Sequence, residues 1–309
     1  MIDTRVNLVH SVHSSVNIDG VRMHVVESGD GPPVVLLHGF PDFWYSWRHQ
    51  MPALAQHGFR AIAPDLRGYN ESDRPTDVSS YRAAAIVRDI AGLIDEVGGS
   101  AFVVGHDWGG LIAWRLAALH PNLVRRLVIL NAPHPAAFRK ELMLNPLQWL
   151  RSTYALYFQL SWLPERTLGA QDFGVLEHAW RRQAVHMRAF SDIDIAHYKS
   201  AMTEGGLTGP LNYYRAALRY PGDLFGPPQT VDVPTLLIWG ERDPYLCPSL
   251  VDRMRPWVPN LEVHRVPYVG HWVHNDVPQR VNRLLVEFFE PDVPCHTNGA
   301  VLSEAAASC

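Results

Sequence analysis

The fold of this chain is decided by the stretch FVVGHDWGG at residues 102–110. Its apolar start is typical of a buried strand, and a helical pattern follows from Leu111 to Leu119. Between them, Gly-x-Asp-x-Gly predicts a sharp turn that exposes Asp107, an arrangement that presents a nucleophile. Glycines are needed at 105 and 109 because side chains there would collide with neighbouring backbone.

On both sides of this turn, short apolar runs alternate with helical patterns. The runs predict strands at 34–37, 59–63, 101–104, 127–130 and 235–239. The amphipathic stretches predict helices at about 82–97, 109–119 and 278–290. Strands that are apolar throughout are expected where helices cover both faces of a parallel sheet. We therefore predict the α/β class, with a mostly parallel central sheet flanked by helices.

The alternation stops between 135 and 225, where β-branched runs are missing. Residues 135–220 hold 13 of the 32 aromatic residues, more than their share of the length. We interpret this segment as a helical cap over the carboxyl edge of the sheet, where ligands bind in such folds. The alternative is an ordinary helical subdomain whose aromatic residues form only its own core. The expected division is an N-terminal extension (1–17), a core (18–134 and 226–292), the cap (135–225) and a flexible tail (293–309).

Composition excludes several classes of protein. The 309 residues carry a net charge of −4, and no basic patch suggests nucleic acid or an anionic membrane surface. No apolar run approaches the roughly 18 residues of a membrane span, and the first residues do not resemble a signal peptide. The three cysteines, Cys247, Cys295 and Cys309, are too scattered for a disulfide framework or a zinc cluster. We expect a cytoplasmic protein.

A carboxylate nucleophile restricts the chemistry. Attack of Asp107 on a carbonyl would give an anhydride, whereas attack on a saturated carbon with a leaving group gives a stable ester. The pattern therefore indicates epoxides or alkyl halides as substrates. The competing interpretation is that Asp107 only caps the following helix.

Three further segments complete a catalytic set. HGFP at 38–41 follows a strand, so the N–H groups of Phe40 and Trp108 are expected to form an oxyanion hole, with His38 structural. Asp243, in the stretch WGERDP, follows another strand, and His271 lies in VGHW some thirty residues later. The chain order is nucleophile, acid, base, with Asp243 orienting the general base His271. Weaker rivals are His274 for the base and Asp252 and Glu241 for the acid.

With these motifs in place, the chain resembles the soluble-type epoxide hydrolases of the α/β-hydrolase superfamily. HGFP, GHDWGG, GERDP and GHW carry the resemblance, which runs from about residue 18 to 290. It implies the α/β-hydrolase fold with an inserted helical cap domain. Haloalkane dehalogenases share much of the set, so it defines the mechanism more than the substrate.

The cap distinguishes these two families. Epoxide hydrolases carry two cap tyrosines that hydrogen-bond the epoxide oxygen, and the resemblance assigns them to Tyr157 and Tyr214. Their near rivals are Tyr154 and Tyr213. The competing interpretation is that both are buried tyrosines bonded elsewhere. Donors are needed because epoxide opening creates an alkoxide, whereas a halide leaves without a proton.

The expected activity is opening of a small apolar epoxide by water to a vicinal diol, through an ester on Asp107. Trp108, Phe40 and Trp272 are expected to bind the substrate. No metal or organic cofactor is implied, and a homodimer is compatible with the sequence. A haloalkane or haloacid dehalogenase is the alternative. Haloacetate dehalogenases usually have Arg where this chain has Trp108, which counts against them. An esterase ranks third because the turn has no serine, and a non-catalytic ligand receptor is the alternative of another class.

Overall fold

The computed structural model describes residues 11–186 and 189–292; the expected tail, 293–309, lies outside this range. An eight-stranded sheet forms its centre, in the order β1-β2-β4-β3-β5-β6-β7-β8. The strands are β1 (Val12–Ile18), β2 (Val21–Ser28), β3 (Pro33–Leu37), β4 (Arg60–Pro64), β5 (Ala101–His106), β6 (Val124–Leu130), β7 (Thr235–Gly240) and β8 (Leu261–Val266).

The sheet is mostly parallel, as the sequence predicts. Strands β4, β3, β5, β6, β7 and β8 pair in parallel, whereas β2 runs antiparallel to both β1 and β4. All five expected strands are present. The expected N-terminal extension, 1–17, is too long, because residues 12–17 belong to β1 and lie in the sheet.

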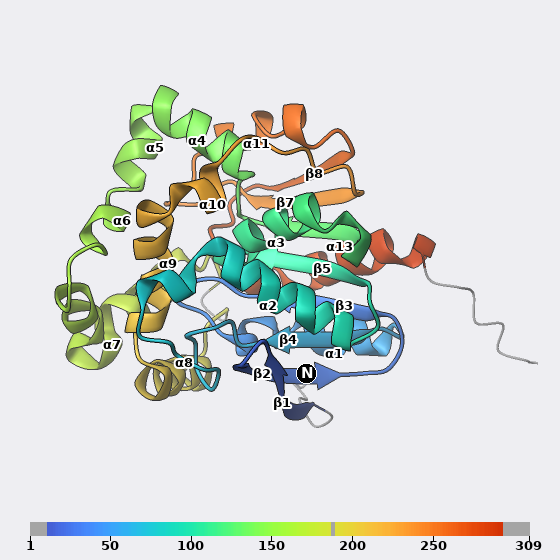
Figure 1. The fold of residues 1–309 in the computed structure, drawn as a ribbon, viewed down its shortest axis with the longest axis horizontal. Helices are drawn as coiled ribbons and strands as arrows, with labels where there is room; N and C mark the ends of the chain where they lie inside the picture. The colour runs from blue at the N-terminus through green and yellow to red at the C-terminus, as the bar shows by residue number, and fades with distance from the viewer. Residues whose placement is uncertain (1–10, 187–188, 293–309) are drawn as a thin grey trace, which may run out of the picture.

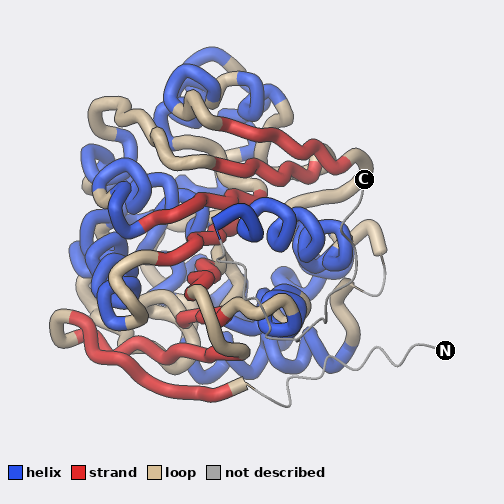
Figure 2. The backbone as a smooth tube through the Cα atoms, turned by 90° about the vertical axis from the view of Figure 1, so that its right-hand side faces the viewer, coloured by secondary structure: helices blue, strands red, loops and turns tan. Residues whose placement is uncertain are grey.

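Helices cover both faces of the sheet, as Figure 2 shows. On the core these are α1 (Gln50–Gln56), α2 (Ala83–Glu96), α3 (Trp108–Leu119), α11 (Ser249–Asp252), α12 (Val273–Asp276) and α13 (Pro278–Phe289). Short 3₁₀ turns are η1 (Trp44–Trp47), η2 (Val78–Tyr81), η3 (Pro121–Leu123), η4 (Arg255–Trp257) and η5 (Glu290–Asp292). Helix α1 packs on α13 and α2 packs on α3, so the central strands are buried between two helical layers.

Between β6 and β7 the elements are all helical. They are α4 (Pro135–Leu144), α5 (Pro146–Arg151), α6 (Tyr154–Tyr157), α7 (Leu163–Gln183), α8 (Asp192–Gly205), α9 (Thr208–Arg219) and α10 (Pro221–Phe225). We call residues 135–225 the cap. The cap helices α5 to α9 gather at the left of Figure 1, beyond one end of the sheet. Among the described residues, no helix is both long and apolar enough to cross a membrane.

Candidate active site

Asp107 lies on the sharp turn between β5 and α3. Its backbone has φ 51° and ψ −118°, a conformation that L-residues rarely adopt and that is typical of strained functional turns. The glycines around it allow close packing. A Cβ on Gly109 would lie 2.2 Å from the carbonyl oxygen of Leu37, and one on Gly105 would lie 2.6 Å from that of Gly109. The glycines therefore fix where the Asp107 side chain stands.

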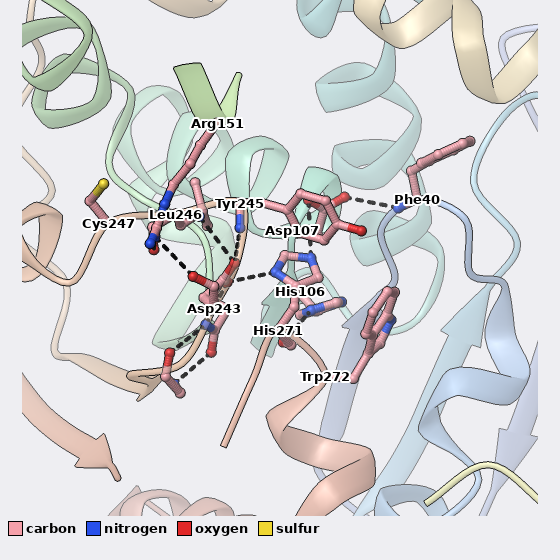
Figure 3. Close-up of polar contacts among 12 residues, drawn as sticks. Phe40, His106, Asp107, Arg151, Asp243, Tyr245, Leu246, Cys247, His271 and Trp272 are labelled. Carbon is pink, nitrogen blue, oxygen red and sulfur yellow. Dashed lines mark hydrogen bonds and ion pairs between the residues drawn. The ribbon is translucent and has the colours of Figure 1, made fainter. Parts of the chain in front are cut away.

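The loop after β3 contacts the carboxylate of Asp107. The backbone N–H of Phe40 donates a 2.9 Å hydrogen bond to Oδ1 of Asp107 (Figure 3). A Cβ on Gly39 would lie only 2.3 Å from Cβ of Asp107, so this approach requires glycine. Trp108 is the first residue of α3, whose N-terminal N–H groups have no partner within the helix. The Phe40 N–H thus donates to the carboxylate, and the N-terminus of α3 begins at the next residue of the chain.

His271 lies between two carboxylates. Its Nδ1 is 2.7 Å from Oδ2 of Asp243, and its Nε2 is 3.5 Å from Oδ2 of Asp107 (Figure 3). Asp243 is held in turn by the side-chain amide of Asn131 at 2.8 Å and by the N–H groups of Tyr245 and Leu246. The structure therefore brings the three residues together in the order that the sequence predicts.

The charges in this group stabilise one another. Burial lowers the pKa of His271, but Asp243 and Asp107 outweigh it and raise the pKa to about 10. Burial raises the pKa of Asp107, yet His271 and the Phe40 N–H favour the carboxylate and lower the pKa overall. At neutral pH the pair is therefore an imidazolium beside an ionised nucleophile.

A cavity of about 240 Å³ opens over Asp107, between the sheet edge and the cap. Apart from Asp107 and a few small polar groups, its walls are apolar. The lining includes Trp108, Leu111, Phe138, Leu142, Trp149, Tyr154, Leu156, Tyr214, Leu218 and Phe225. This volume corresponds to about eight waters of liquid, so it fits a small apolar molecule.

Two tyrosines of the cap line this cavity with Asp107. Tyr214, on α9, packs edge-on against Trp108, with ring centroids 5.0 Å apart. Tyr154, on α6, packs against Tyr214 with centroids 5.8 Å apart. The pKa of both hydroxyls is raised, mainly by burial and also by the charge of Asp107. Both phenols therefore stay protonated and can donate hydrogen bonds into the cavity.

Tyr157 is not part of this group, and its assignment is corrected. Its hydroxyl lies 2.6 Å from Oγ1 of Thr167 and 3.4 Å from the carbonyl oxygen of Leu163. Tyr157 and Tyr154 stand at opposite ends of the short helix α6, and it is Tyr154 that lines the cavity. The rival position therefore replaces the expected one.

The side chains of Phe40 and Trp272 are also absent from the lining of this cavity. The Phe40 ring points away from Asp107 in Figure 3 and packs against Phe158 and Tyr214. The indole N–H of Trp272 donates to both carboxylate oxygens of the buried Asp42, at 3.2 and 3.0 Å. Of the three expected substrate-binding side chains, only Trp108 lines the cavity.

The rival residues have other partners. His38 is fully buried; its Nδ1 donates to the Gly39 carbonyl, and its Nε2 accepts from the Leu66 N–H. Glu241 and Asp252 both pair with Arg265. These contacts are structural and leave Asp243 as the acid beside His271.

His274 belongs to a buried cluster behind the site. Asp42, His106 and His274 each offer one ligand atom within 4.8 Å of the others. The indole N–H of Trp272 donates to Asp42, and Nε2 of His106 donates to the His271 carbonyl. Nε2 of His274 forms a hydrogen bond with the Ser46 hydroxyl. Nδ1 of His274 has no hydrogen-bond partner among the described residues, and Nδ1 of His106 lies 3.5 Å from Oδ2 of Asp42. The His106 contact links this cluster to the backbone of His271.

Residues 32–277 match the family model of the alpha/beta hydrolase fold. The chain belongs to the α/β-hydrolase family. Among curated members it is 40% identical to the AB hydrolase superfamily protein YfhM of Bacillus subtilis, over 89% of this chain and 96% of the relative. It is 37% identical to Epoxide hydrolase 3 of Xenopus tropicalis, over 94% and 81%.

Solved structures of this α/β-hydrolase family give the same picture. An epoxide hydrolase of Bacillus megaterium in complex with an inhibitor has a TM-score of 0.84 and 32% identity, over 90% of this chain and all of that one. The epoxide hydrolase VrEH1 of Vigna radiata has a TM-score of 0.81 and 32% identity, over 92% and 99%. The resemblance to epoxide hydrolases is therefore confirmed over most of the chain.

Two residues of this α/β-hydrolase site were not among the expected ones. Asn131 follows β6 with φ 41° and bonds both Asp243 and the Gly240 backbone. Its signal in the sequence is a polar residue directly after a buried strand, on the edge where Asp107 and Asp243 also lie. Tyr154 was considered only as a rival, because a helical offset of three residues cannot be resolved from sequence.

Proposed function

We propose that this chain opens apolar epoxides with water to vicinal diols, through a covalent ester on Asp107. The observation that carries the proposal is the shared cavity of Asp107, Tyr154 and Tyr214, with His271 beside the nucleophile. A carboxylate and two phenols that face one small apolar space match the needs of a neutral, strained cyclic ether. The named epoxide hydrolases among the relatives support the same substrate class.

In the first half-reaction, Tyr154 and Tyr214 donate hydrogen bonds to the epoxide oxygen. A carboxylate oxygen of Asp107 attacks a ring carbon, and the carbon–oxygen bond of the ring breaks. One tyrosine gives its proton to the oxygen that leaves, which forms a hydroxyalkyl ester on Asp107. Proton donation of this kind contributes about 10²–10⁴-fold to rate.

The ester changes the charge of the site. Asp107 loses its negative charge, so one of the two carboxylates that raise the pKa of His271 is removed. His271 then returns a proton to the tyrosinate and becomes neutral. In the resting enzyme His271 is protonated, so it can act as a base only after Asp107 has reacted.

In the second half-reaction, neutral His271 takes a proton from water, and the hydroxide attacks the ester carbonyl of Asp107. The N–H groups of Phe40 and Trp108 stabilise the oxyanion. The diol leaves with the proton that His271 returns, and the new carboxyl group of Asp107 gives its own proton to His271. This step restores the resting imidazolium–carboxylate pair.

A haloalkane dehalogenase is the second candidate. In that family the residue at the position of Trp108 helps to hold the halide, and the Trp108 side chain lines the same cavity here. A halide leaves without a proton, however, so Tyr154 and Tyr214 would have no role in that reaction. A turnover screen with styrene oxide, longer alkyl epoxides and haloalkanes distinguishes the two. Diol formation without halide release supports the proposal, whereas halide release without diol formation contradicts it.

A further inference from the structure

The outer surface of the cap carries an unusual run of exposed apolar side chains. Ten residues between 141 and 162 are exposed, and nine of them are apolar. They are Met143, Leu144, Pro146, Leu147, Trp149, Leu150, Leu156, Leu160 and Trp162. Monomeric soluble proteins rarely expose apolar residues together in this way, and such surfaces mark interaction sites. We call this set the apolar face.

The apolar face adjoins the catalytic cavity. Trp149 and Leu156 belong to the face and also line the cavity, although they are 57% and 53% exposed. Leu218, which is 48% exposed, lines the cavity from α9. Helices α5 and α6 lie at the left of the molecule in Figure 1, above α7 and away from the sheet. The cavity therefore reaches the molecular surface at this face.

Along the sequence that forms the apolar face, the exposed charges are all of one sign. Between 139 and 166 the exposed charged residues are Arg139, Lys140 and Arg166. Glu141 is buried, and Glu165 is paired with Arg215. Thus the chain as a whole carries −4, but its apolar face is flanked by cations. The composition of the whole chain does not reveal this local reversal.

We propose that the apolar face docks on the surface of an anionic lipid layer, with the cavity mouth turned toward the lipid. Leucines with exposed tryptophans and flanking cations are the chemistry of a surface that lies in a lipid interface. The part of the proposal that concerns substrate rests on the proposed function: an apolar epoxide dissolved in the lipid would enter the cavity without crossing water.

A second copy of this chain is the competing occupant. Such a dimer would cover Trp149 and Leu156 with protein and close the route into the cavity, whereas a fluid lipid layer leaves that route open. Because substrate must reach the cavity, a lipid layer is favoured over a protein partner on this face.

The test uses the full chain and vesicles in a flotation assay. We expect it to bind vesicles of phosphatidylcholine with about a quarter phosphatidylglycerol, more weakly in high salt and on phosphatidylcholine alone. The variant Leu147→Glu/Leu150→Glu changes two exposed positions outside the cavity lining. It should lose at least about tenfold in vesicle partitioning, because two leucines no longer enter the apolar layer.

The matched control is Val175→Glu/Ile193→Glu, which adds the same charge at two exposed apolar positions on α7 and α8. It should retain at least half of the binding, and circular dichroism should show all variants folded. Equal partitioning of both variants, or no binding by the original chain, overturns the proposal. So does a dimer in sedimentation velocity that dissociates only in Leu147→Glu/Leu150→Glu.

Turnover of styrene oxide dissolved in water separates this proposal from the proposed function. We expect it to be the same for the original chain and for Leu147→Glu/Leu150→Glu, while turnover of a long-chain epoxide held in anionic vesicles falls. Opening of styrene oxide without vesicle binding leaves the function intact and refutes docking. Vesicle binding without opening of any epoxide refutes the function and leaves docking intact.

Discussion

Nε2 of His271 lies 3.5 Å from Oδ2 of Asp107, so the expected base stands directly beside the expected nucleophile. The proximity gives the two groups opposite charges at rest and couples their titrations. Formation of an ester on Asp107 would break this coupling. In the proposed mechanism, the timing of the two half-reactions would follow from this one contact.

The raised pKa of His271 predicts how stability depends on pH. A histidine whose pKa rises on folding stabilises the fold below its unfolded pKa of about 6.5. The contribution is lost as pH rises through the folded value, which is about 10. The gap in free energy of unfolding between the original chain and His271→Gln should therefore shrink from pH 6.5 to pH 10. Urea unfolding across this window measures it, and a constant gap would contradict the charge assignment.

The tyrosine assignment predicts different effects for neighbouring positions. Tyr154→Phe/Tyr214→Phe should slow ester formation by about 10²–10⁴-fold, because both proton donors are lost. Tyr157→Phe should change it by less than about threefold, since its hydroxyl bonds Thr167 outside the cavity. Single-turnover kinetics with styrene oxide measures both rates. A larger loss in Tyr157→Phe than in the double variant would refute the correction.

The close packing of Gly39 against Asp107 predicts that a side chain at position 39 displaces the nucleophile and lowers activity. A Cβ there would lie 2.5 Å from Oδ1 of Asp107, so Gly39→Ala should move the carboxylate away from Phe40. We expect kcat/KM for styrene oxide to fall by at least about 100-fold. The control is Gly169→Ala, where a Cβ meets nothing within 4 Å and activity should be unchanged. Full activity in Gly39→Ala would show that the turn tolerates a side chain.

The sequence was sufficient for the parts of the fold that are buried on all sides. Strands β3 to β7 each contain a continuous run of buried apolar residues, and glycines at 105 and 109 identified the turn. The antiparallel strands β1 and β2 and the edge strand β8 were not predicted. Their polar, partly exposed residues, such as those of Leu261–Val266, carry no continuous apolar signal.

At the site, residues placed by strand ends were predicted better than residues placed by the cap. Asp107, Asp243 and His271 lie in the loops after β5, β7 and β8, so their meeting point follows from the parallel sheet. The prediction that Tyr157 lines the cavity was wrong because the rotation of α6 about its axis depends on how the cap packs. A four-residue helix has no sequence periodicity that would reveal this rotation. Asn131 was missed because its role depends on a contact with Asp243, 112 positions away.

The central claim is that Asp107 becomes covalently bound to the substrate, and the mass of the intact His271→Gln variant after incubation with styrene oxide tests it most directly. The account predicts an increase equal to the mass of the epoxide, located by digestion on the peptide that contains Asp107 and absent from Asp107→Asn/His271→Gln. An unmodified His271→Gln protein, under conditions where the original chain converts the same epoxide to diol, would contradict it.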